Sequence, residues 1–438
     1  TLTIKDGVNQ TYNLPIVSGS NMELQVVEWK ENSISIMYTG AGTKYTTKVG
    51  NHAESNVQEL TAIDHIVYSL ATDDLTTTTN QPLIISIKDD TNATIGTIYL
   101  IIPAIVATDK GSTALDVTEE NAEATSIVVL DGAKLTADAT KYTYDDITVY
   151  PGGQLVIDKD GKLGMHSLTL RTGASWGAAK YEHKYPLFLV KGDYTNTSGQ
   201  INLDYVTTAD LYYPLSVPEV VTITDIKYPV DIYGSNVHKL NTGSFQLKYY
   251  DGAQRVAQGS QYGTGWIVVD ESTTTTLTPN QGYAIWGIPK KINGTRQTYG
   301  IHRIPMKTTA EDLANHENTD EMVRVMPHGI NNANILPNDI GWNYLGNPYL
   351  AQLGGMDGDN QSLQIGQLIP ENINGEWTGG WVNNGEQVRY VTLTNDCQNF
   401  EALPVSKATI LPFTTFFVQA AQTGVIALNA PTAVAAPA

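Results

Sequence analysis

The chain is poor in the residues that build covalent and metal-bound frameworks. Its 438 residues include a single cysteine, Cys397. One cysteine excludes an intramolecular disulfide, and it excludes zinc or iron–sulfur sites that need several thiolates. The eight histidines are scattered along the chain, without an HExxH motif or a close pair. The sequence therefore predicts neither a zinc centre nor a non-haem iron centre.

The short motifs of several large enzyme classes are missing as well. The sequence contains no P-loop, no glycine fingerprint for a dinucleotide and no GxSxG nucleophile motif. Each of these motifs needs a fixed local spacing, so its absence is informative. We therefore expect a protein without enzymatic activity and without an organic cofactor.

Positive charge is scarce and long apolar runs are absent. The chain has 26 Lys and Arg against 45 Asp and Glu, a net charge of −19. This sign repels phosphate backbones and anionic lipid. No apolar run approaches the roughly 20 residues of a membrane-spanning helix. We therefore expect no nucleic-acid partner and no membrane insertion.

Position 1 is Thr1 rather than methionine. Such a start is expected if a signal peptide is removed on export, and equally if the chain has been trimmed. Export without disulfides fits a bacterial surface protein better than a eukaryotic secreted one. The expected location is extracellular, at the bacterial cell surface.

What the chain does contain favours β-structure, with 38 glycines, 24 tyrosines and abundant threonine. A length of 438 residues predicts two to four domains. In residues 1–106, short runs alternate apolar and polar residues with period two, which predicts an Ig-like β-sandwich. Residues 107–124 are polar and acidic, and they are expected to form a linker. The alternating runs are TLTI (1–4), MELQVVEW (22–29), SISIMY (33–38), HIVYSL (65–70), PLIISIKDD (82–90) and TIGTIYLII (94–102).

Residues 125–204 carry a repeat of 20 to 21 residues, seen when 126–138, 146–158 and 167–179 are aligned. A weaker fourth copy contains Leu187, Leu189 and Gly192. Paired apolar residues with a recurring glycine corner are what stacked rungs require, which predicts a short β-solenoid capped by flanking domains. An antiparallel meander with long hairpins is the alternative. The aligned positions are Ile127, Ile147 and Leu168, then Gly132, Gly152 and Gly173, then Leu135, Leu155 and Trp176.

Residues 205–438 are again β-like and predict a jelly-roll-like β-sandwich region. It could consist of two modules, 205–307 and 326–430, followed by a C-terminal tail. One helix is expected over 308–325, with Thr309 as its N-cap and acidic residues in its first turn. All-β is therefore the expected fold class.

Carboxylates offer few candidate sites. Two acidic, glycine-containing turns, 158–161 and 357–360, are weak calcium candidates; in the second the ligands would be Asp357, Asp359 and Asn360. The alternative for both is that Asp and Gly serve turn geometry. A polysaccharide lyase or glycosidase would need a pair of acids across a cleft. The residues considered for such a role are Asp145, Asp146, Glu182 and Asp193.

Aromatic residues give another candidate. Trp377 and Trp381 lie in a Gly- and Asn-rich segment that continues to Tyr390. Exposed aromatic faces there would suit stacking on a glycan or contact with a protein partner. The alternative is that these rings cover the edge of the sandwich.

Several short motifs follow one another along the C-terminal half. GWNYLGNPYL (341–350) is followed by ILPFTTFFVQA (410–420), while YYPLSVP (212–218) precedes LTPNQGYAIWG (277–287). Over residues 205–430 this order resembles the β-domains of large exported surface proteins of Bacteroidota, where the corresponding stretches read GWNLIGNPYP, PGQGFFV and PGKGY. Leu350 and Phe413–Thr414 depart from that pattern.

The resemblance implies a non-enzymatic adhesin-like or structural protein, of the kind often exported by the type IX system. Its partners would be other copies of itself, other surface proteins or glycans. If it polymerises, the terminal strands TLTIKD (1–6) and VIALNA (425–430) are the expected pairing elements. The alternatives are a carbohydrate-binding or polysaccharide-lyase module, and a phage fibre or spike protein.

Overall fold

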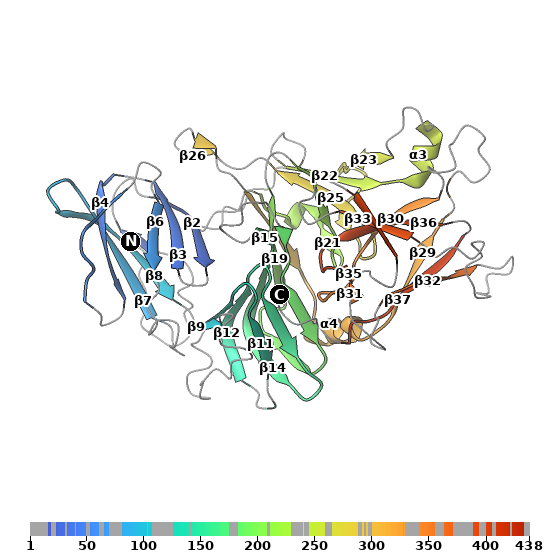
Figure 1. Cartoon of the computed structure of the whole chain (residues 1–438), viewed down its shortest axis with the longest axis horizontal. Helices are drawn as coiled ribbons and strands as arrows, with labels where there is room; N and C mark the ends of the chain where they lie inside the picture. Colours follow the sequence, from blue (N-terminus) through green and yellow to red (C-terminus); the bar gives the residue numbers. More distant parts are fainter. Residues whose placement is uncertain are drawn as a thin grey trace.

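The computed structural model shows an all-β protein. Two α-helices are present among the described residues, α3 (Gly252–Gln258) and α4 (Ala310–Glu317), together with the 3₁₀ turn η2 (Ile223–Asp225). No described helix has the length and apolar character needed to cross a membrane. In Figure 1 the N-terminal sheets (blue), the parallel strands (green) and the C-terminal sheets (yellow to red) follow one another.

The structure describes residues 16–18, 23–30, 33–39, 41–49, 53–60, 65–69, 81–102, 104–106, 126–137, 139, 142–174, 183–207, 211–228, 240, 245–258, 265–287, 291–292, 295–296, 300–326, 328, 341–354, 363–370, 389–393, 400–404, 409–420 and 423–432. For 16–39, 65–69, 100–106, 291–296, 354–404 and a few strand ends, only the backbone is described.

The N-terminal region forms two antiparallel sheets. Five of the six alternating runs predicted here are strands, and the run 1–4 lies outside the described residues. Leu83, Ile85 and Ile87 are fully buried, as their period-two spacing requires. The sheets are β1 (Ile16–Ser18), β8 (Thr94–Ile102), β7 (Gln81–Lys88), β4 (Lys44–Val49) and β5 (Gln58–Glu59), in that order, and β2 (Glu23–Lys30), β3 (Ser33–Thr39) and β6 (His65–Ser69).

The middle of the chain is a stack of parallel strands, with the register that the repeat predicts. Ile127 pairs with Ile147, and Ile147 with Leu168. In the second sheet Leu135 pairs with Leu155. Gly132, Gly152 and Gly173 all have positive φ (71°, 82° and 137°), the conformation that makes glycine the corner residue. The first sheet contains β9 (Ala104–Val106), β10 (Ile127–Val129), β12 (Tyr142–Val149), β14 (Lys162–Arg171), β18 (Asp193–Asn196) and β19 (Ile201–Thr207); the second contains β11 (Lys134–Ala137), β13 (Gln154–Ile157) and β17 (Leu187–Val190).

The third repeat differs from the alignment. Leu155 pairs with Phe188 of β17, whereas Trp176 lies outside the described residues. The chain inserts the small pair β15 (Gly173–Ala174) and β16 (His183–Lys184) before β17 begins. Leu187 and Leu189 therefore belong to the third repeat rather than to a fourth copy. The repeat predicts Trp176 as the counterpart of Leu155, because it follows Gly173 by the same three residues. Such a spacing cannot reveal that other residues are inserted between two strands.

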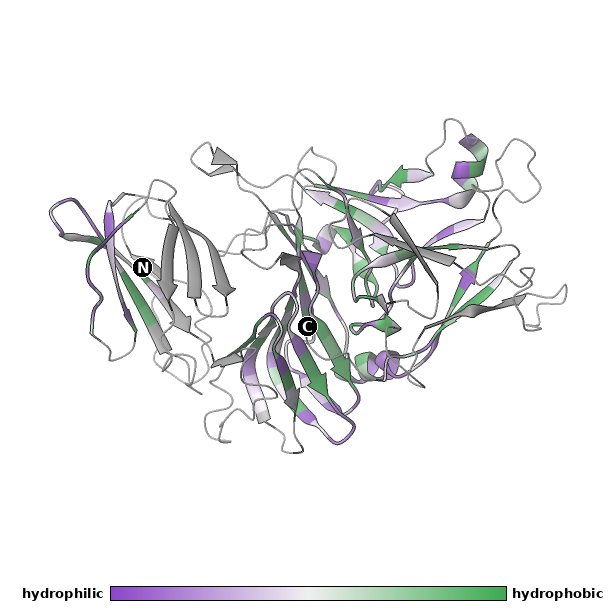
Figure 2. Cartoon of the chain, in the orientation of Figure 1, coloured by the Kyte–Doolittle hydropathy of each residue, from purple (hydrophilic) through white to green (hydrophobic). Residues whose placement is uncertain are grey.

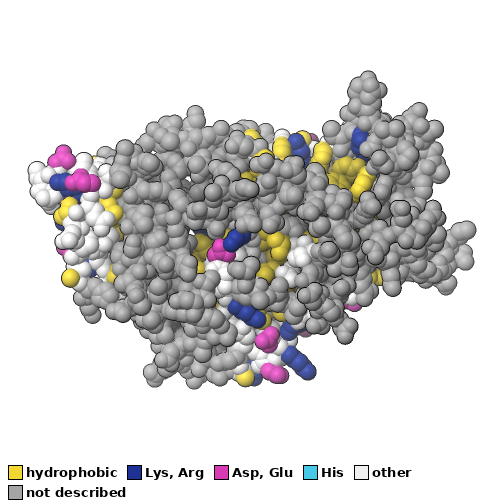
Figure 3. Space-filling model, viewed as in Figure 1, with side chains coloured by type: hydrophobic (Ala, Val, Ile, Leu, Met, Phe, Trp, Pro, Cys, Tyr) yellow, Lys and Arg dark blue, Asp and Glu magenta, His cyan; other side chains and the backbone are white. Residues whose placement is uncertain are grey.

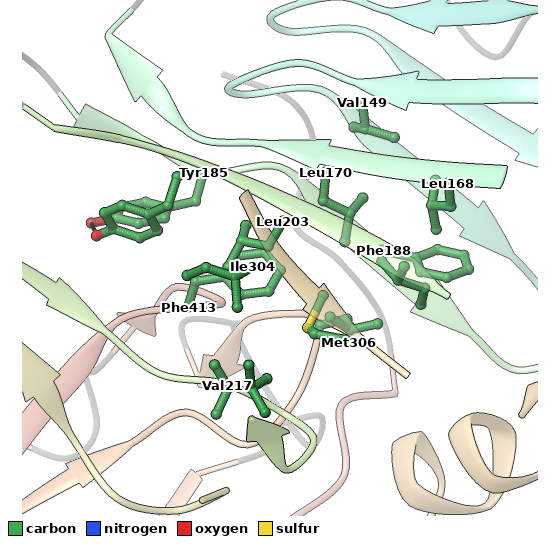
Figure 4. Packing of buried hydrophobic residues seen from close by; sticks show 14 of the residues in the cluster. Val149, Leu168, Leu170, Tyr185, Phe188, Leu203, Val217, Ile304, Met306 and Phe413 are labelled. Atoms are coloured by element: carbon green, nitrogen blue, oxygen red, sulfur yellow. Dashed lines mark hydrogen bonds between the residues drawn. The ribbon is translucent and has the colours of Figure 1, made fainter. Parts of the chain in front are cut away.

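Both sheets of the stack are closed by C-terminal elements. β28 (Gly300–Met306) pairs antiparallel with β19. At the edge of the second sheet, the Phe188 N–H donates to the Leu350 carbonyl oxygen at 2.9 Å. Apolar residues from the stack and from the C-terminal half form one buried cluster, and Figure 4 shows Phe413 packed near Tyr185, Leu203 and Ile304. Hydrophobic residues accordingly concentrate on the stacked strands (Figure 2).

The C-terminal half contains two four-stranded sheets with the same strand order. We call strands β20 to β25 module 1 and strands β30 to β36 module 2. Numbered along the chain, the four strands of each sheet pair in the same way. The first strand pairs with the fourth, the fourth pairs with the second, and the second pairs with the third. The orders are β20 (Tyr213–Leu215), β25 (Tyr283–Gly287), β22 (Phe245–Tyr250), β23 (Trp266–Val268) and β30 (Trp342–Gly346), β36 (Thr415–Gln419), β33 (Arg389–Leu393), β34 (Phe400–Pro404).

Each module also has a two-stranded sheet in the same place along the chain. β21 (Val221–Thr222) pairs with β24 (Thr276–Leu277), and β31 (Leu353–Gly354) pairs with β35 (Thr409–Ile410). The remaining strands pair as β26 (Lys291–Ile292) with β27 (Thr295–Arg296), and as β29 (Glu321–Val325), β37 (Gly424–Leu428) and β32 (Leu363–Pro370).

The registers of the two modules define equivalent residues. Leu215 pairs with Tyr283, and Leu345 with Phe416. In LTPNQGY and ILPFTTF the tyrosine and the phenylalanine both stand four residues after a proline. Asn280 is therefore equivalent to Phe413, and Ser216 to Gly346.

The modules exchange equivalent hydrogen bonds. The Ser216 N–H donates to the Phe413 carbonyl at 3.0 Å, and the Gly346 N–H donates to the Asn280 carbonyl at 3.1 Å. Each first strand thus contacts the turn of the other module in the same way. The C-terminal half behaves as a duplicated unit with reciprocal contacts.

Two expectations for the C-terminal half are corrected. The helix predicted over 308–325 is α4 alone, because Asn318 ends it and EMVRV forms β29. Thr309 is its N-cap, as predicted, accepting from the Asp312 N–H at 3.0 Å. The strand predicted as a free pairing element at 425–430 corresponds to β37, which is paired on both sides by β29 and β32. Its hydrogen-bonding edges are occupied, so it cannot pair with a neighbouring molecule.

Candidate functional site

Most of the residues predicted as contacts fall outside the described residues. Trp377 and Trp381 lie there, as do the calcium candidates Asp357, Asp359 and Asn360. Tyr390 is placed by its backbone in β33, opposite Val418 of β36 and Leu403 of β34. Their predicted roles stay predictions.

Among the acidic candidates, Glu182 lies outside the described residues, and Asp146 and Asp193 lie too far apart to act as a pair. Asp158 to Gly161 is a tight turn between β13 and β14, closed by the Gly161 N–H to the Asp158 carbonyl at 2.8 Å. Asp146 lies opposite Ser167, whereas Asp193 lies opposite Lys162, five residues away on the same strand. Five residues of extended strand span about 16 Å. Paired glycosidic carboxylates stand only about 5–10 Å apart.

Burial accounts for the properties of Asp146. It raises the pKa of the Asp146 carboxyl, against the lowering effect of the Ser167 hydroxyl that donates to it. Among the described residues, no group of three or more His, Cys, Asp or Glu side chains could hold a metal ion.

Two histidines are core residues. His183 lies among the rings of Tyr185, Tyr205 and Tyr213, with centroids 4.8–5.4 Å away. Burial lowers the pKa of His183 to about 3, and it also lowers the pKa of His302. Both imidazoles are therefore neutral at physiological pH, and they pack as uncharged rings.

The clearest candidate for contact with a partner is the outer side of the four-stranded sheet of module 1. Phe245 and Leu247 of β22 point into the core and are fully buried, so the alternate residues Gln246, Lys248 and Tyr250 face outward. We call the outward side chains of this sheet the aromatic face. Its members are Tyr212, Gln246, Lys248, Tyr250, Trp266, Val268 and Trp286, all partly exposed or exposed.

One end of the aromatic face combines two rings with polar groups. Tyr212 and Trp286 have nearly parallel rings, with an interplanar angle of 28° and centroids 6.2 Å apart. The Lys248 ammonium lies 4.0 Å from the centroid of the Tyr212 ring. The Tyr212 hydroxyl donates to Gln246 Oε1. Gln246 stands directly opposite Trp286 in the register of β22 and β25, which places the amide beside the indole.

The other end of the aromatic face packs against module 2. Tyr250 contacts Phe417 edge-on at a centroid distance of 5.2 Å, and Trp266 contacts Tyr344 at 5.1 Å. Trp342 also meets Phe417, at 6.1 Å. Hydrophobic side chains gather over the region of β22 and β23 in Figure 3. One end of the face therefore joins the modules, while at the other end Tyr212 contacts Trp286, Gln246 and Lys248.

Residues 341–350 form a junction that connects module 2 to α4 and to the parallel strands. The side chain of Asn347 is buried, and its Nδ2 donates to the carbonyls of Ala351, Ile410 and Leu411 at 3.0–3.1 Å. Its Oδ1 accepts from the Tyr349 N–H at 2.9 Å, which holds the loop in its turn.

Tyr349 and Leu350 extend the junction to α4. The Tyr349 hydroxyl lies 2.8 Å from each of the Thr319 and Leu428 carbonyls, and it accepts from the Glu321 N–H. The Leu350 N–H donates to the Glu317 carboxyl, at 3.1 Å to Oε1. Complete burial raises the pKa of Glu317 to about 8. The residues Asn347, Tyr349 and Leu350 of this stretch therefore serve packing and hydrogen bonding.

Part of the aromatic face could have been found in the sequence. FQLKYY begins with alternating buried and partly exposed residues, and Trp286 is the one partly exposed residue of YAIWG, so the outward positions Lys248, Tyr250 and Trp286 follow from parity once one strand face is known. Tyr212 does not follow, since it lies just before β20 and joins Trp286 only through strand pairing. The sequence drew attention to Trp377 and Trp381 because they flank glycines.

No family model, no curated protein and no solved structure matches this chain. The resemblance to Bacteroidota surface domains therefore stays a prediction that rests on the quoted motifs.

Proposed function

We propose that the chain is a non-enzymatic structural or adhesin-like protein of a bacterial cell surface, which acts through a rigid assembly of β-modules. In this proposal the two N-terminal sheets form an Ig-like sandwich. The parallel strands form a short β-solenoid, and modules 1 and 2 are jelly-roll-like sandwiches. The motif order shared with exported surface β-domains supports the location, which is extracellular.

The observation that carries the proposal is the aromatic face, held outward by a scaffold with a continuous core. Tyrosine and tryptophan supply much contact area at a small loss of conformational entropy, which suits binding to a partner. The hydrophobic cluster that begins at Ile127 extends through module 1 to Phe413. A face mounted on such a core keeps its geometry under load, as an adhesive or structural protein requires.

Surface labelling tests the location. Intact cells of the source organism are treated with a membrane-impermeant biotinylation reagent, and a cytoplasmic enzyme serves as the control. We expect the protein to be labelled in intact cells while the enzyme is labelled only after lysis. Labelling of both proteins only after lysis would contradict the proposal.

Adhesion is tested with beads coated with the purified chain. We expect the beads to attach to surface material of the same bacterium, whether other copies, other surface proteins or glycans. Beads coated with a Trp266→Ala/Trp286→Ala variant should attach less. Equal attachment by wild-type beads and albumin-coated beads would remove the adhesive role.

A further inference from the structure

We infer that the Tyr212–Trp286 end of the aromatic face binds neutral glycans, with the two rings as the stacking platform and Gln246 and Lys248 as hydrogen-bond donors. The inference begins with the rings. Trp286 lies in β25 and Tyr212 immediately precedes the neighbouring strand β20; their rings make an angle of 28°, and both residues are partly exposed. The flat C–H face of a pyranose packs on such rings, as apolar ligand surfaces do on aromatic side chains.

The polar groups are placed to meet hydroxyls. Tyr212 already donates to Gln246 Oε1, which fixes the amide and leaves its NH₂ as a donor. The Lys248 ammonium lies over the Tyr212 ring at 4.0 Å. In the part of the chain that the structure describes, no ion pair includes Lys248. The Gln246 amide and the Lys248 ammonium therefore retain N–H donors next to the two aromatic rings. The hydroxyls of a bound sugar would lie within their reach.

The same polar groups argue against a protein as the occupant. The centre of a protein–protein interface is depleted of lysine, and a stable interface covers about 800 Å² on each partner. Here Lys248 and Gln246 lie on β22, between β25, which carries Trp286, and the outer strand β23. Aromatic rings mixed with a few fixed polar groups are typical of a small-ligand site.

Charge selects the class of glycan. The chain carries a net charge of −19, which repels anionic polymers at long range. A single lysine within the site supplies donors to neutral hydroxyls as well as to carboxylates. Neutral glycans are therefore favoured over uronates or sulfated chains.

The test is affinity electrophoresis of the purified chain in gels that contain one soluble polysaccharide each. The neutral probes are mannan, xyloglucan, galactomannan and mixed-linkage β-glucan, and the acidic probes are alginate and heparin. We expect at least one neutral polysaccharide to retard the wild type. Trp286→Ala and Tyr212→Ala should each weaken binding about tenfold, the effect of losing one aromatic contact.

Two controls keep the result specific. Tyr99→Ala removes an aromatic side chain that is 43% exposed on β8 of the N-terminal region, and it should leave retardation unchanged. Trp286→Tyr keeps a ring and should retain most of the binding, which separates loss of the platform from loss of folding. Retardation by acidic polysaccharides alone, by none of the probes, or equally in wild type and the Tyr212→Ala/Trp286→Ala variant would overturn the inference. Surface labelling is independent of all these outcomes.

Discussion

Modules 1 and 2 share one strand order and exchange equivalent hydrogen bonds, yet they fill equivalent positions with different chemistry. At the turn before the last strand, module 1 has Asn280 and module 2 has Phe413, with φ of 66° and 61°. Asparagine tolerates this left-handed conformation, whereas a bulky residue does so at a cost. The backbone conformation is therefore imposed by the shared turn, and the side chain is chosen by its surroundings.

Those surroundings differ because module 2 is inserted against the parallel strands. Phe413 is fully buried in the cluster that contains the stack and module 1, and Leu350 joins it there. The rest of module 2 has a core of its own, which includes Leu345 and Phe416. Phe413 in the turn of module 2 and Leu350 in the loop after β30 thus fix module 2 to the parallel strands and module 1. The strand topology therefore fixes the backbone conformation of the turn, and the residues packed against the turn determine which side chain occupies it.

The largest effect is expected at Asn347, whose counterpart in module 1 is Val217. Asn347→Leu removes the side-chain donor to the carbonyls of Ala351, Ile410 and Leu411, of which only Leu411 keeps a second side-chain donor, the Thr414 hydroxyl. We expect a loss of about 3–5 kcal/mol in the free energy of unfolding. Val217→Ala removes only buried apolar volume and should cost about 2 kcal/mol. Urea denaturation followed by fluorescence measures both; a smaller loss at Asn347 than at Val217 would refute its role as the junction.

The next effect separates the two turns. Phe413→Gly relieves a left-handed residue but removes a fully buried ring, so the net loss should be about 3 kcal/mol. Asn280→Gly keeps a residue suited to positive φ and should change stability by less than about 1 kcal/mol. The same denaturation experiment compares them. Equal losses would show that the two turns are energetically alike.

A smaller effect is expected where the modules touch. A Cβ on Gly346 would lie 2.5 Å from the Ser216 Cβ and 2.9 Å from the Gln281 carbonyl oxygen. Gly346→Ala should therefore cost about 1–3 kcal/mol. Ser216→Gly removes one of these obstacles, so the double variant should be more stable than the sum of the two single changes predicts. Strict additivity in thermal or urea unfolding would argue against the contact.

The last effect accumulates with pH, and it concerns a buried carboxyl next to module 2. Burial raises the folded-state pKa of Glu317 to about 8, above its ordinary value of 4.5. The folded protein then binds more protons than the unfolded chain between these values, so this group's contribution to stability falls as pH rises from 4.5 to 8. The slope is at most about 1.4 kcal/mol per pH unit.

Glu317→Gln keeps an acceptor for the Leu350 N–H and cannot ionise. We expect the variant to lose this part of the pH dependence and to exceed the wild type in stability at pH 8. Unfolding free energies measured from pH 5 to pH 8 check the sign. The control Glu311→Gln, in the first turn of α4, should leave the slope unchanged. A wild-type slope that survives in Glu317→Gln would assign it to other groups.

Prediction from the sequence was best where one local rule acts alone. The positions of Ile127, Ile147 and Leu168, and their glycine corners, follow from period and parity. The N-cap at Thr309 follows from local capping chemistry. The extent of α4 was overestimated because EMVRV has helix-forming residues, yet Glu321 to Val325 pair with β37 and become a strand. The predicted surface contacts at Trp377 and Trp381 remain untested.

The sequence by itself determined the all-β character, the step of the parallel strands and the two proline-led turns, because each depends on residues close together in the chain. Only the tertiary structure decided that Phe188 pairs with Leu155 in the stack, that Phe413 enters a core outside its own module, and that Tyr212 meets Trp286. These pairings join residues far apart in the chain. Their free energy comes from burial and strand register, which no short stretch of sequence specifies.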